Sequence, residues 1–189
     1  MRLSVVTAFL MAVLALAGCK DDKTAAAPKP LEPTAESVAH FCNMGVLDHP
    51  GPKGQIFLKG KTEPVWFASV RDTFAFTLLP EEPKEISAIY VTDMGKAQGW
   101  LKPEPGGWVD ARTAWFVLWS EYDSGMGGRE AVSFAKQEDA ARFISRFGGR
   151  IARFDEVPEE YVLGPDPSPQ TQAEAPSHGD QSHAHSHSP

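Results

Sequence analysis

Between residues 38 and 162, apolar and polar positions follow the same order twice. The segments "VWFASVRDTFAF" (65–76) and "VSFAKQEDAARF" (132–143) each begin with strand-like alternation and continue with helical periodicity. Each carries an Asp in the first turn of the expected helix, where the helix dipole favours a negative charge. At an offset of 67 residues, five of the twelve positions are identical: Val65/Val132, Phe67/Phe134, Ala68/Ala135, Asp72/Asp139 and Phe76/Phe143. This pattern indicates an internal repeat.

Further short apolar runs flank both copies and predict additional strands. The run before each copy is "QIFLKG" (55–60) or "TAWFVLWS" (113–120), and the run after it is "ISAIYVTD" (86–93) or "GRIARFDEV" (149–157). Each half therefore has the order β-β-α-β. We predict an α+β fold made of two ββαβ lobes, residues 38–97 and 98–162, related by the internal repeat.

The first 19 residues have the form of a bacterial lipoprotein leader. Arg2 precedes an apolar run over 3–17, and "LAGC" ends at Cys19. The run is shorter than the ~20 apolar residues that a transmembrane helix needs. We therefore interpret 1–18 as a signal peptide and Cys19 as the lipidated first residue of the mature chain. Lys20 in place of an aspartate favours the outer over the inner membrane, and the protein would face the periplasm.

Two polar segments flank the apolar region. Residues 19–37, rich in Ala and Pro, are expected to be a flexible tether. Residues 163–189 contain few hydrophobic residues and many Pro, Ser, Gln and His, so they are expected to be disordered.

Charge excludes one class of partner. Without the leader and its single Arg2, the chain has 17 Lys and Arg against 25 Asp and Glu, a formal net charge of −8. Such an acidic chain is unsuited to nucleic acid or to lying flat on anionic lipid. Lipid at Cys19 is then the expected membrane link.

With Cys19 lipidated, Cys42 has no cysteine partner within the chain. An unpaired cysteine in an exported protein indicates a reactive thiol, an intermolecular link or a metal ligand. The alternative is a small buried hydrophobic residue.

Thioether and imidazole groups near Cys42 favour the metal-ligand interpretation. Met44 is two residues away, so in a β-conformation both sulfurs would face the same side. Met126, in "DSGMGGRE", is flanked by glycines that suit a loop folding over a site. Thiolate with thioether selects Cu(I), whereas zinc requires more Cys or His ligands. His49 and His40 are nitrogen candidates, although His49 could instead hydrogen-bond the adjacent turn. Met94, at the end of an expected strand, is expected to be a packing or turn residue.

The tail contains a second candidate metal site. Four of the six histidines lie there, at His178, His183, His185 and His187. Their alternate spacing suits a borderline divalent ion such as Cu(II), Ni(II) or Zn(II). Catalytic motifs are not evident: the chain has no phosphate loop, HExxH or CxxC, and nothing indicates a base and oxyanion site around Cys42.

Several blocks together resemble the NosL family of accessory lipoproteins of bacterial nitrous oxide reductase. They are the leader cysteine, "CNM…HPGPKGQIFLKG", "VWFASVRDTFAF" and "YDSGMGGREAVSFAKQEDAARFISRFGG". The resemblance implies a non-enzymatic, periplasm-facing Cu(I) chaperone with two lobes like those of the organomercurial lyase MerB. It implies Cys42, Met44 and Met126 as ligands, and a histidine that we assign to His49. In the family the residue between Cys and Met is often glycine, whereas here it is Asn43.

The same resemblance implies partners. They are nitrous oxide reductase, whose copper–sulfide centre would receive the copper, and a membrane ABC-type maturation complex. Two alternatives remain open at this point. One is a general periplasmic metal buffer with the tail as its main binder, and the other is a thiol-dependent enzyme on a MerB-like fold.

Overall fold

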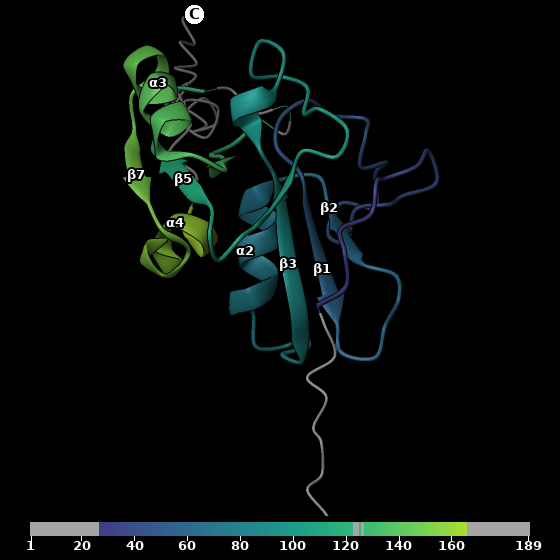
Figure 1. Ribbon diagram of the computed structural model, residues 1–189. Helices are drawn as coiled ribbons and strands as arrows, with labels where there is room; N and C mark the ends of the chain where they lie inside the picture. The colour runs from purple at the N-terminus through teal and green to yellow at the C-terminus, as the bar shows by residue number, and fades with distance from the viewer. Residues whose placement is uncertain (1–26, 123–124, 126, 166–189) are drawn as a thin grey trace, which may run out of the picture.

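The computed structural model describes residues 27–122, 125 and 127–165 (Figure 1). Two antiparallel sheets and their helices follow one another along the chain. The first half contains β1 (Gly54–Leu58), β2 (Val65–Phe67), α2 (Val70–Leu78), β3 (Ile86–Thr92), the 3-10 helix η2 (Met94–Lys96) and β4 (Trp108–Asp110). The second half contains β5 (Trp115–Leu118), β6 (Val132–Phe134), α3 (Gln137–Phe147), β7 (Arg150–Ala152), the 3-10 helix η3 (Phe154–Glu156) and α4 (Glu159–Leu163).

The sheets have the strand orders β2-β1-β3-β4 and β6-β5-β7, and every pairing is antiparallel. The mixed α and β architecture is the one predicted, and the predicted runs overlap β1, β2, α2, β3, β5, β6, α3 and β7. Strand β4 and helix α4 lie outside these runs, and the end of the run 149–157 is the 3-10 helix η3 rather than a strand. Ser69 caps α2 by accepting a hydrogen bond from the Asp72 N–H at 3.0 Å, and Asp139 lies in the first turn of α3. Both acidic residues are therefore near helix N-termini, as expected.

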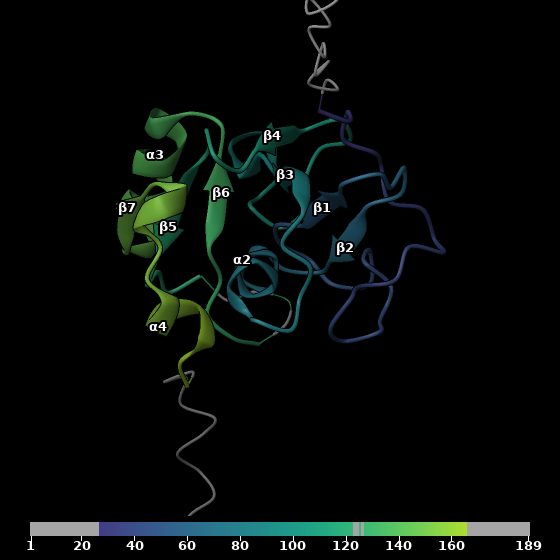
Figure 2. The same ribbon diagram turned by 90° about the horizontal axis from the view of Figure 1, so that it is seen from below.

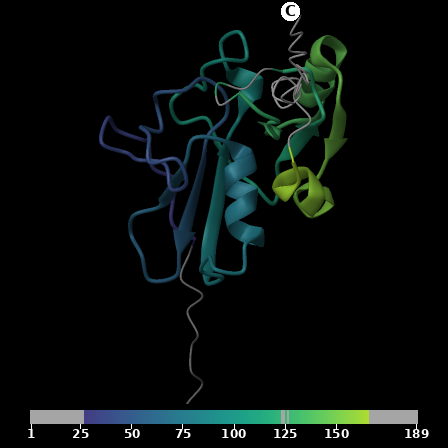
Figure 3. The same ribbon diagram turned by 180° about the vertical axis from the view of Figure 1, so that it is seen from behind.

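The two halves share their largest hydrophobic cluster. Helix α2 lies between the first sheet and the second half, as the views from below and behind show (Figures 2 and 3). Phe74 of α2 makes an edge-to-face contact with Phe116 of β5, with ring centroids 4.9 Å apart. Because one cluster includes residues of both halves, separating them would expose apolar surface.

Strand β5 is apolar on both faces, which explains its continuous hydrophobic run. Phe116 and Leu118 belong to the cluster around α2, whereas Val117 belongs to a second cluster with Phe143 of α3. Alternate residues of a strand face opposite sides. A strand covered by helices on both sides needs apolar residues at consecutive positions.

The position of β4 was not predicted. Trp108–Asp110 lie within residues 98–162, yet they pair with β3 of the first sheet. This short segment shows too little alternation to be identified as a strand. Its place at the sheet edge is determined by pairing with β3, a contact that the local sequence does not reveal.

The expected flexible tether is wrong for residues 28–37, which follow the surface of the first sheet. The backbone of Leu31 both donates to and accepts from the Gln55 side-chain amide, each at 2.9 Å. The indole N–H of Trp108 donates to Glu32 Oε1 at 2.8 Å. Gln55 has a polar side chain that is buried on β1, and the backbone of Leu31 satisfies its hydrogen bonds.

Among residues 27–122, 125 and 127–165, no helix has both the length and the apolar character that crossing a bilayer requires.

Candidate metal centre

The Cys-Asn-Met sequence lies in a tight turn. The Asn43 N–H donates to the Ala39 carbonyl at 3.0 Å, and the Ala39 N–H donates to the Met44 carbonyl at 2.9 Å. Asn43 has a φ of 56°, in the left-handed region. Asparagine tolerates this conformation better than most residues that carry a Cβ. The turn therefore depends on Asn43.

The β-conformation expected for Cys42 and Met44 is wrong, because the backbone reverses at Asn43. The alternation rule holds only for an extended chain. Cys42 is half-buried and packs against a small cluster of Ala39, Val46 and Ala68, whereas the Met44 side chain is 38% exposed. The two sulfur-bearing residues thus have different environments within one loop.

The structure places His49 against Met44 instead. His49 Nε2 lies 3.4 Å from Met44 Sδ. For an ion bonded as zinc is, at ~2.3 Å from sulfur and ~2.0 Å from nitrogen with a tetrahedral angle, the two ligand atoms would be roughly 3.5 Å apart. The contact therefore already has the spacing of two ligands of one ion.

Any ion here would depend on thioether sulfur. Within the described ranges, no three His, Cys, Asp or Glu side chains gather closely enough to hold a metal ion. Cys42 is the free cysteine of these ranges and lies in the same loop as Met44. The available set of thiol, thioether and imidazole is soft and suits Cu(I) better than a hard divalent ion.

His40 and Met94 have other environments. His40 Nε2 lies 2.8 Å from Glu82 Oε1, and its ring contacts Phe76 edge-on. Met94 is fully buried in the cluster around α3 and has the packing role expected for it. His40 therefore interacts with a carboxylate rather than with the Cys-Asn-Met turn.

The glycine-flanked loop returns to the segment that follows His49. A Cβ added to Gly125 would lie 2.3 Å from Pro50 Cδ, so only a glycine permits this approach. Tyr122 donates its hydroxyl to the Trp100 carbonyl at 2.7 Å and fixes the start of this loop. Met126 itself lies outside the described residues, as do Cys19 and the tail histidines His178, His183, His185 and His187, so their roles stay predictions.

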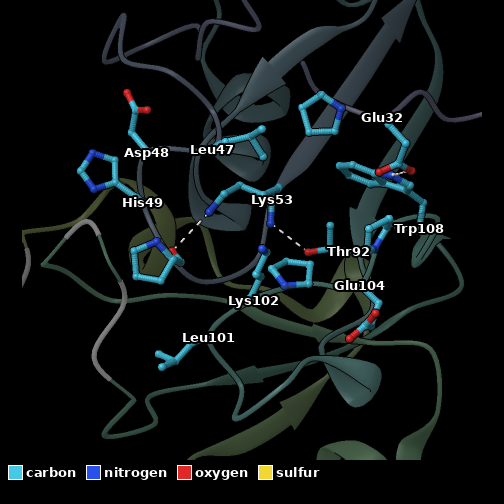
Figure 4. Close-up of a pocket in the computed structure, with 14 residues that line it drawn as sticks. Glu32, Leu47, Asp48, His49, Lys53, Thr92, Leu101, Lys102, Glu104 and Trp108 are labelled. Carbon is cyan, nitrogen blue, oxygen red and sulfur yellow. Dashed lines mark hydrogen bonds between the residues drawn. The ribbon is translucent and has the colours of Figure 1, made fainter. Parts of the chain in front are cut away.

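A buried lysine lies below His49. Lys53 Nζ donates to the carbonyls of Pro50 (3.2 Å), Gly51 (2.9 Å) and Ala68 (3.1 Å). Lys53 is one of the residues that line a cavity (Figure 4). Burial lowers the pKa of Lys53 to about 8, and the nearby charge of Glu130 opposes that shift.

Glu130 belongs to the second half of the chain and follows the glycine-flanked segment "GMGGR" in sequence. Its Oε1 accepts hydrogen bonds from the backbone N–H groups of Val70 (3.1 Å), Arg71 (3.0 Å) and Ala131 (2.9 Å). The carboxyl group therefore caps the N-terminus of α2. Burial raises its pKa to about 8, although the Arg71 N–H and the Lys53 ammonium favour the charged form.

The cavity beside His49 has a volume of about 620 Å³. Its lining is mostly apolar and rich in proline, with Leu47, Leu101 and Trp108 among its members. Leu47 is 58% exposed and Leu101 is 52% exposed, so apolar side chains surround the approach to His49. Large exposed apolar side chains next to a functional group are typical of contact surfaces.

A family model described as NosL matches residues 30–162. The chain belongs to the NosL family. The resemblance noted in the sequence is thereby confirmed, and the match includes the Cys-Asn-Met turn, His49, Lys53 and Glu130. The histidine-rich tail lies beyond it.

Named NosL proteins cover most of the chain. The copper-binding lipoprotein NosL of Achromobacter cycloclastes is 40% identical over 155 residues, which are 82% of this chain and 80% of that protein. The copper-binding lipoprotein NosL of Stutzerimonas stutzeri is 35% identical over 156 residues, 79% of each. The crystal structure of the copper chaperone NosL from Shewanella denitrificans superposes with a TM-score of 0.64 at 35% identity, covering 70% of this chain and 97% of that one.

NosL membership also gives Asn43 a structural explanation. We noted that the family often has glycine at this position, and the φ of 56° is one that glycine adopts freely. Asparagine is one of the few residues with a Cβ that adopt this conformation readily.

Lys53 and Glu130 are the polar residues of this NosL site that sequence reasoning missed. Lys53 directly precedes β1 in "PKGQIF", and Glu130 lies two residues before β6 begins in "REAVSF". A charged residue at such a position is usually at the surface. Their burial follows from the packing of the two halves, which no local pattern reveals.

Proposed function

We propose that this chain is a copper chaperone that binds Cu(I) at Cys42, Met44 and His49, with Met126 as a further ligand. Copper is its cargo rather than a permanent cofactor, and the protein is not an enzyme. The names of its relatives, copper-binding lipoprotein and copper chaperone, support this role.

The contact between His49 and Met44 is the observation that carries the proposal. Nε2 and Sδ lie 3.4 Å apart in a loop that also contains the free Cys42. The thiolate supplies strength and the thioether supplies preference for Cu(I) over the hard divalent ions. The imidazole would be the third donor, and Met126 would be a fourth; the neighbouring Gly125 lies against Pro50, the residue after His49.

Delivery requires that a partner reach the ligands. Met44 is 38% exposed, and the neighbouring Leu47 and Leu101 are more exposed still. A ligand on the surface can pass its ion to an incoming donor atom without unfolding the loop. Exposure is therefore consistent with transfer, whereas a permanently held ion is usually enclosed.

We also propose where the protein is located and which proteins it serves. Lipid on Cys19 would hold the protein at the periplasmic side of a membrane, the outer rather than the inner one. The receiving protein would be nitrous oxide reductase, at its copper–sulfide centre, with a membrane ABC-type complex assisting. The relatives' names support a lipoprotein anchor, and the family resemblance supports the partners.

We also propose that the two halves are ββαβ lobes related by an internal repeat. The strand orders β2-β1-β3 and β6-β5-β7, each with a helix between its second and third strands in sequence, support an internal repeat of ββαβ lobes. The tail after residue 163 would be a separate, weaker site for divalent ions.

Anaerobic titration with Cu(I) against a competing chelator tests the function. The soluble form without residues 1–19 should bind one Cu(I) tightly, and Cys42→Ser should remove that binding because a hydroxyl is a poor donor to Cu(I). Met94→Leu serves as the control, since Met94 is buried elsewhere. Affinity of Cys42→Ser within about threefold of the wild type, well below the ~1.4 kcal/mol of a tenfold change, would contradict the site.

A further inference from the structure

Lys53 is a buried cation whose three hydrogen-bond acceptors all belong to the backbone around the candidate copper site. The residue is 4% exposed. Two of its acceptors, the carbonyls of Pro50 and Gly51, belong to the two residues that follow His49. The third is the carbonyl of Ala68, at the junction of β2 and α2.

Ala68 lies between Lys53 and Cys42, the other candidate ligand on this side. It belongs to the small cluster with Ala39 and Val46 against which Cys42 packs. One ammonium group thus joins the backbone that carries His49 to the wall behind Cys42. Figure 4 shows His49 at the rim of the cavity and Lys53 extending toward the Pro50 carbonyl.

Two residues of the second half also lie beside this part of the first half. Gly125 lies against Pro50, and Glu130 binds the N-terminus of α2 immediately after Ala68 and Ser69. Charge attraction between Lys53 and Glu130 acts on both groups. The backbone that follows His49 and the N-terminus of α2 are therefore each bound by a buried polar side chain.

A lysine is a costly choice if its only task is to stabilise the fold. Removing an ammonium group from water has an effective cost of several kcal/mol, and replacing buried ions by apolar residues of similar volume is often neutral or stabilising. Retaining the charge is reasonable when a particular backbone geometry is needed. Here the geometry that it maintains is that of the residues next to His49.

We propose that Lys53 is a positioning residue of the copper site: it does not touch the metal, but holds the His49 segment so that the imidazole meets Met44 and Cys42 at one ion. This inference rests on the proposed function. It adds a residue with its own role to that site, and it predicts that Lys53 acts on copper binding through His49.

A double-mutant cycle on the soluble protein separates this role from general stabilisation. Cu(I) affinity is measured by anaerobic competition with a chelator for wild type, Lys53→Met, His49→Ala and the double variant. We expect each single change to weaken binding about tenfold, and the double variant to bind within about threefold of His49→Ala. Such non-additivity is expected when one residue acts through the other.

Lys59→Met is the matched control, since Lys59 is an exposed lysine at the end of β1. It should leave affinity unchanged. Circular dichroism and thermal unfolding show which variants fold; if Lys53→Met does not, Lys53→Gln, which keeps an N–H donor, enters the same cycle.

The outcomes are distinct. Equal affinity of the folded Lys53 variant and wild type would overturn the positioning role while leaving the proposed function intact. A roughly hundredfold loss in the double variant would also overturn it, because independent effects multiply. If wild type bound no Cu(I), the proposed function itself would be wrong and this inference would go with it.

Discussion

The imidazole of His49 contacts the thioether of Met44, with 3.4 Å between Nε2 and Sδ. Four residues lie between them in sequence, and a turn there is closed by the Asp48 N–H, which donates to the Gly45 carbonyl at 3.0 Å. The contact brings two of the candidate ligands together, and the proposed copper site rests on it. It also gives each neighbouring residue a testable consequence.

Replacing the thioether should affect copper without affecting the fold. Met44→Leu keeps the side-chain volume but loses the sulfur, so Cu(I) affinity should fall about tenfold or more, while a surface change typically alters stability by less than ~0.5 kcal/mol. Met94→Leu is the opposite case: copper affinity is unchanged, and a volume-conserving core substitution costs less than ~1.5 kcal/mol. Competition titration and denaturant unfolding measure both. A larger copper effect from Met94 would place the site elsewhere.

Gly125→Ala should move the glycine loop away from the site. The new Cβ would lie 2.3 Å from Pro50 Cδ, so the loop must shift. If that loop supplies a ligand, Cu(I) binding weakens.

Gly60→Ala is the control for this change, since a Cβ there meets open space but Gly60 has a φ of 74°. It should cost roughly 1–2 kcal/mol of stability from backbone strain and leave copper affinity unchanged. Identical Cu(I) affinity of Gly125→Ala and wild type would show that the loop contributes nothing to binding.

The buried pair predicts how stability depends on pH. The folded pKa of Glu130 is raised from 4.5 to about 8, so between these values the folded protein keeps a proton that the unfolded chain releases. Stability therefore falls as pH rises from about 4.5 to about 8. The pKa of Lys53 is lowered from 10.5 to about 8, so the unfolded chain binds the extra proton above pH 8 and stability rises again toward pH 10.5.

Glu130→Gln should remove the first of these two slopes. Denaturant midpoints at pH 5, 6.5 and 8 measure it, with Glu85→Gln as an exposed control. An unchanged slope in Glu130→Gln would mean that other groups cause the pH dependence.

The tail prediction can now be tested at a better boundary. Arg71 Nη2 donates to the Gly164 carbonyl at 3.0 Å, and Arg129 Nη2 donates to the Pro165 carbonyl at 3.2 Å. Truncation after Pro165 keeps both bonds and removes His178, His183, His185 and His187.

That truncation should leave Cu(I) binding unchanged and abolish a weaker class of Zn(II) binding. In the full-length protein, this Zn(II) binding should decline as pH falls through ~6.5, because the imidazoles become protonated. Isothermal titration of both forms with Zn(II) is the measurement, and equal heats from both would show that the tail binds no metal.

Local sequence was sufficient for much of this protein. Periods of 2 and 3.6 residues located the strands and helices of both halves except β4 and α4, because these elements bury one face in the core. The "LAGC" motif predicted lipidation, the single remaining cysteine indicated soft-metal chemistry, and the combined motifs identified the family. Each of these signals lies within a short stretch of chain.

The geometry of the site was decided by contacts between distant segments. Asn43 takes a left-handed conformation because residues on both sides of it are hydrogen-bonded to each other, and this ended the expected alternation of Cys42 and Met44. Lys53 reaches Ala68, and Glu130 reaches Val70, 60 residues away in sequence. The bond of Lys53 forms within the first half, whereas that of Glu130 forms only when the two halves pack together. Residue type therefore predicted which candidate ligands were available, and only the folded structure shows that His49 contacts Met44.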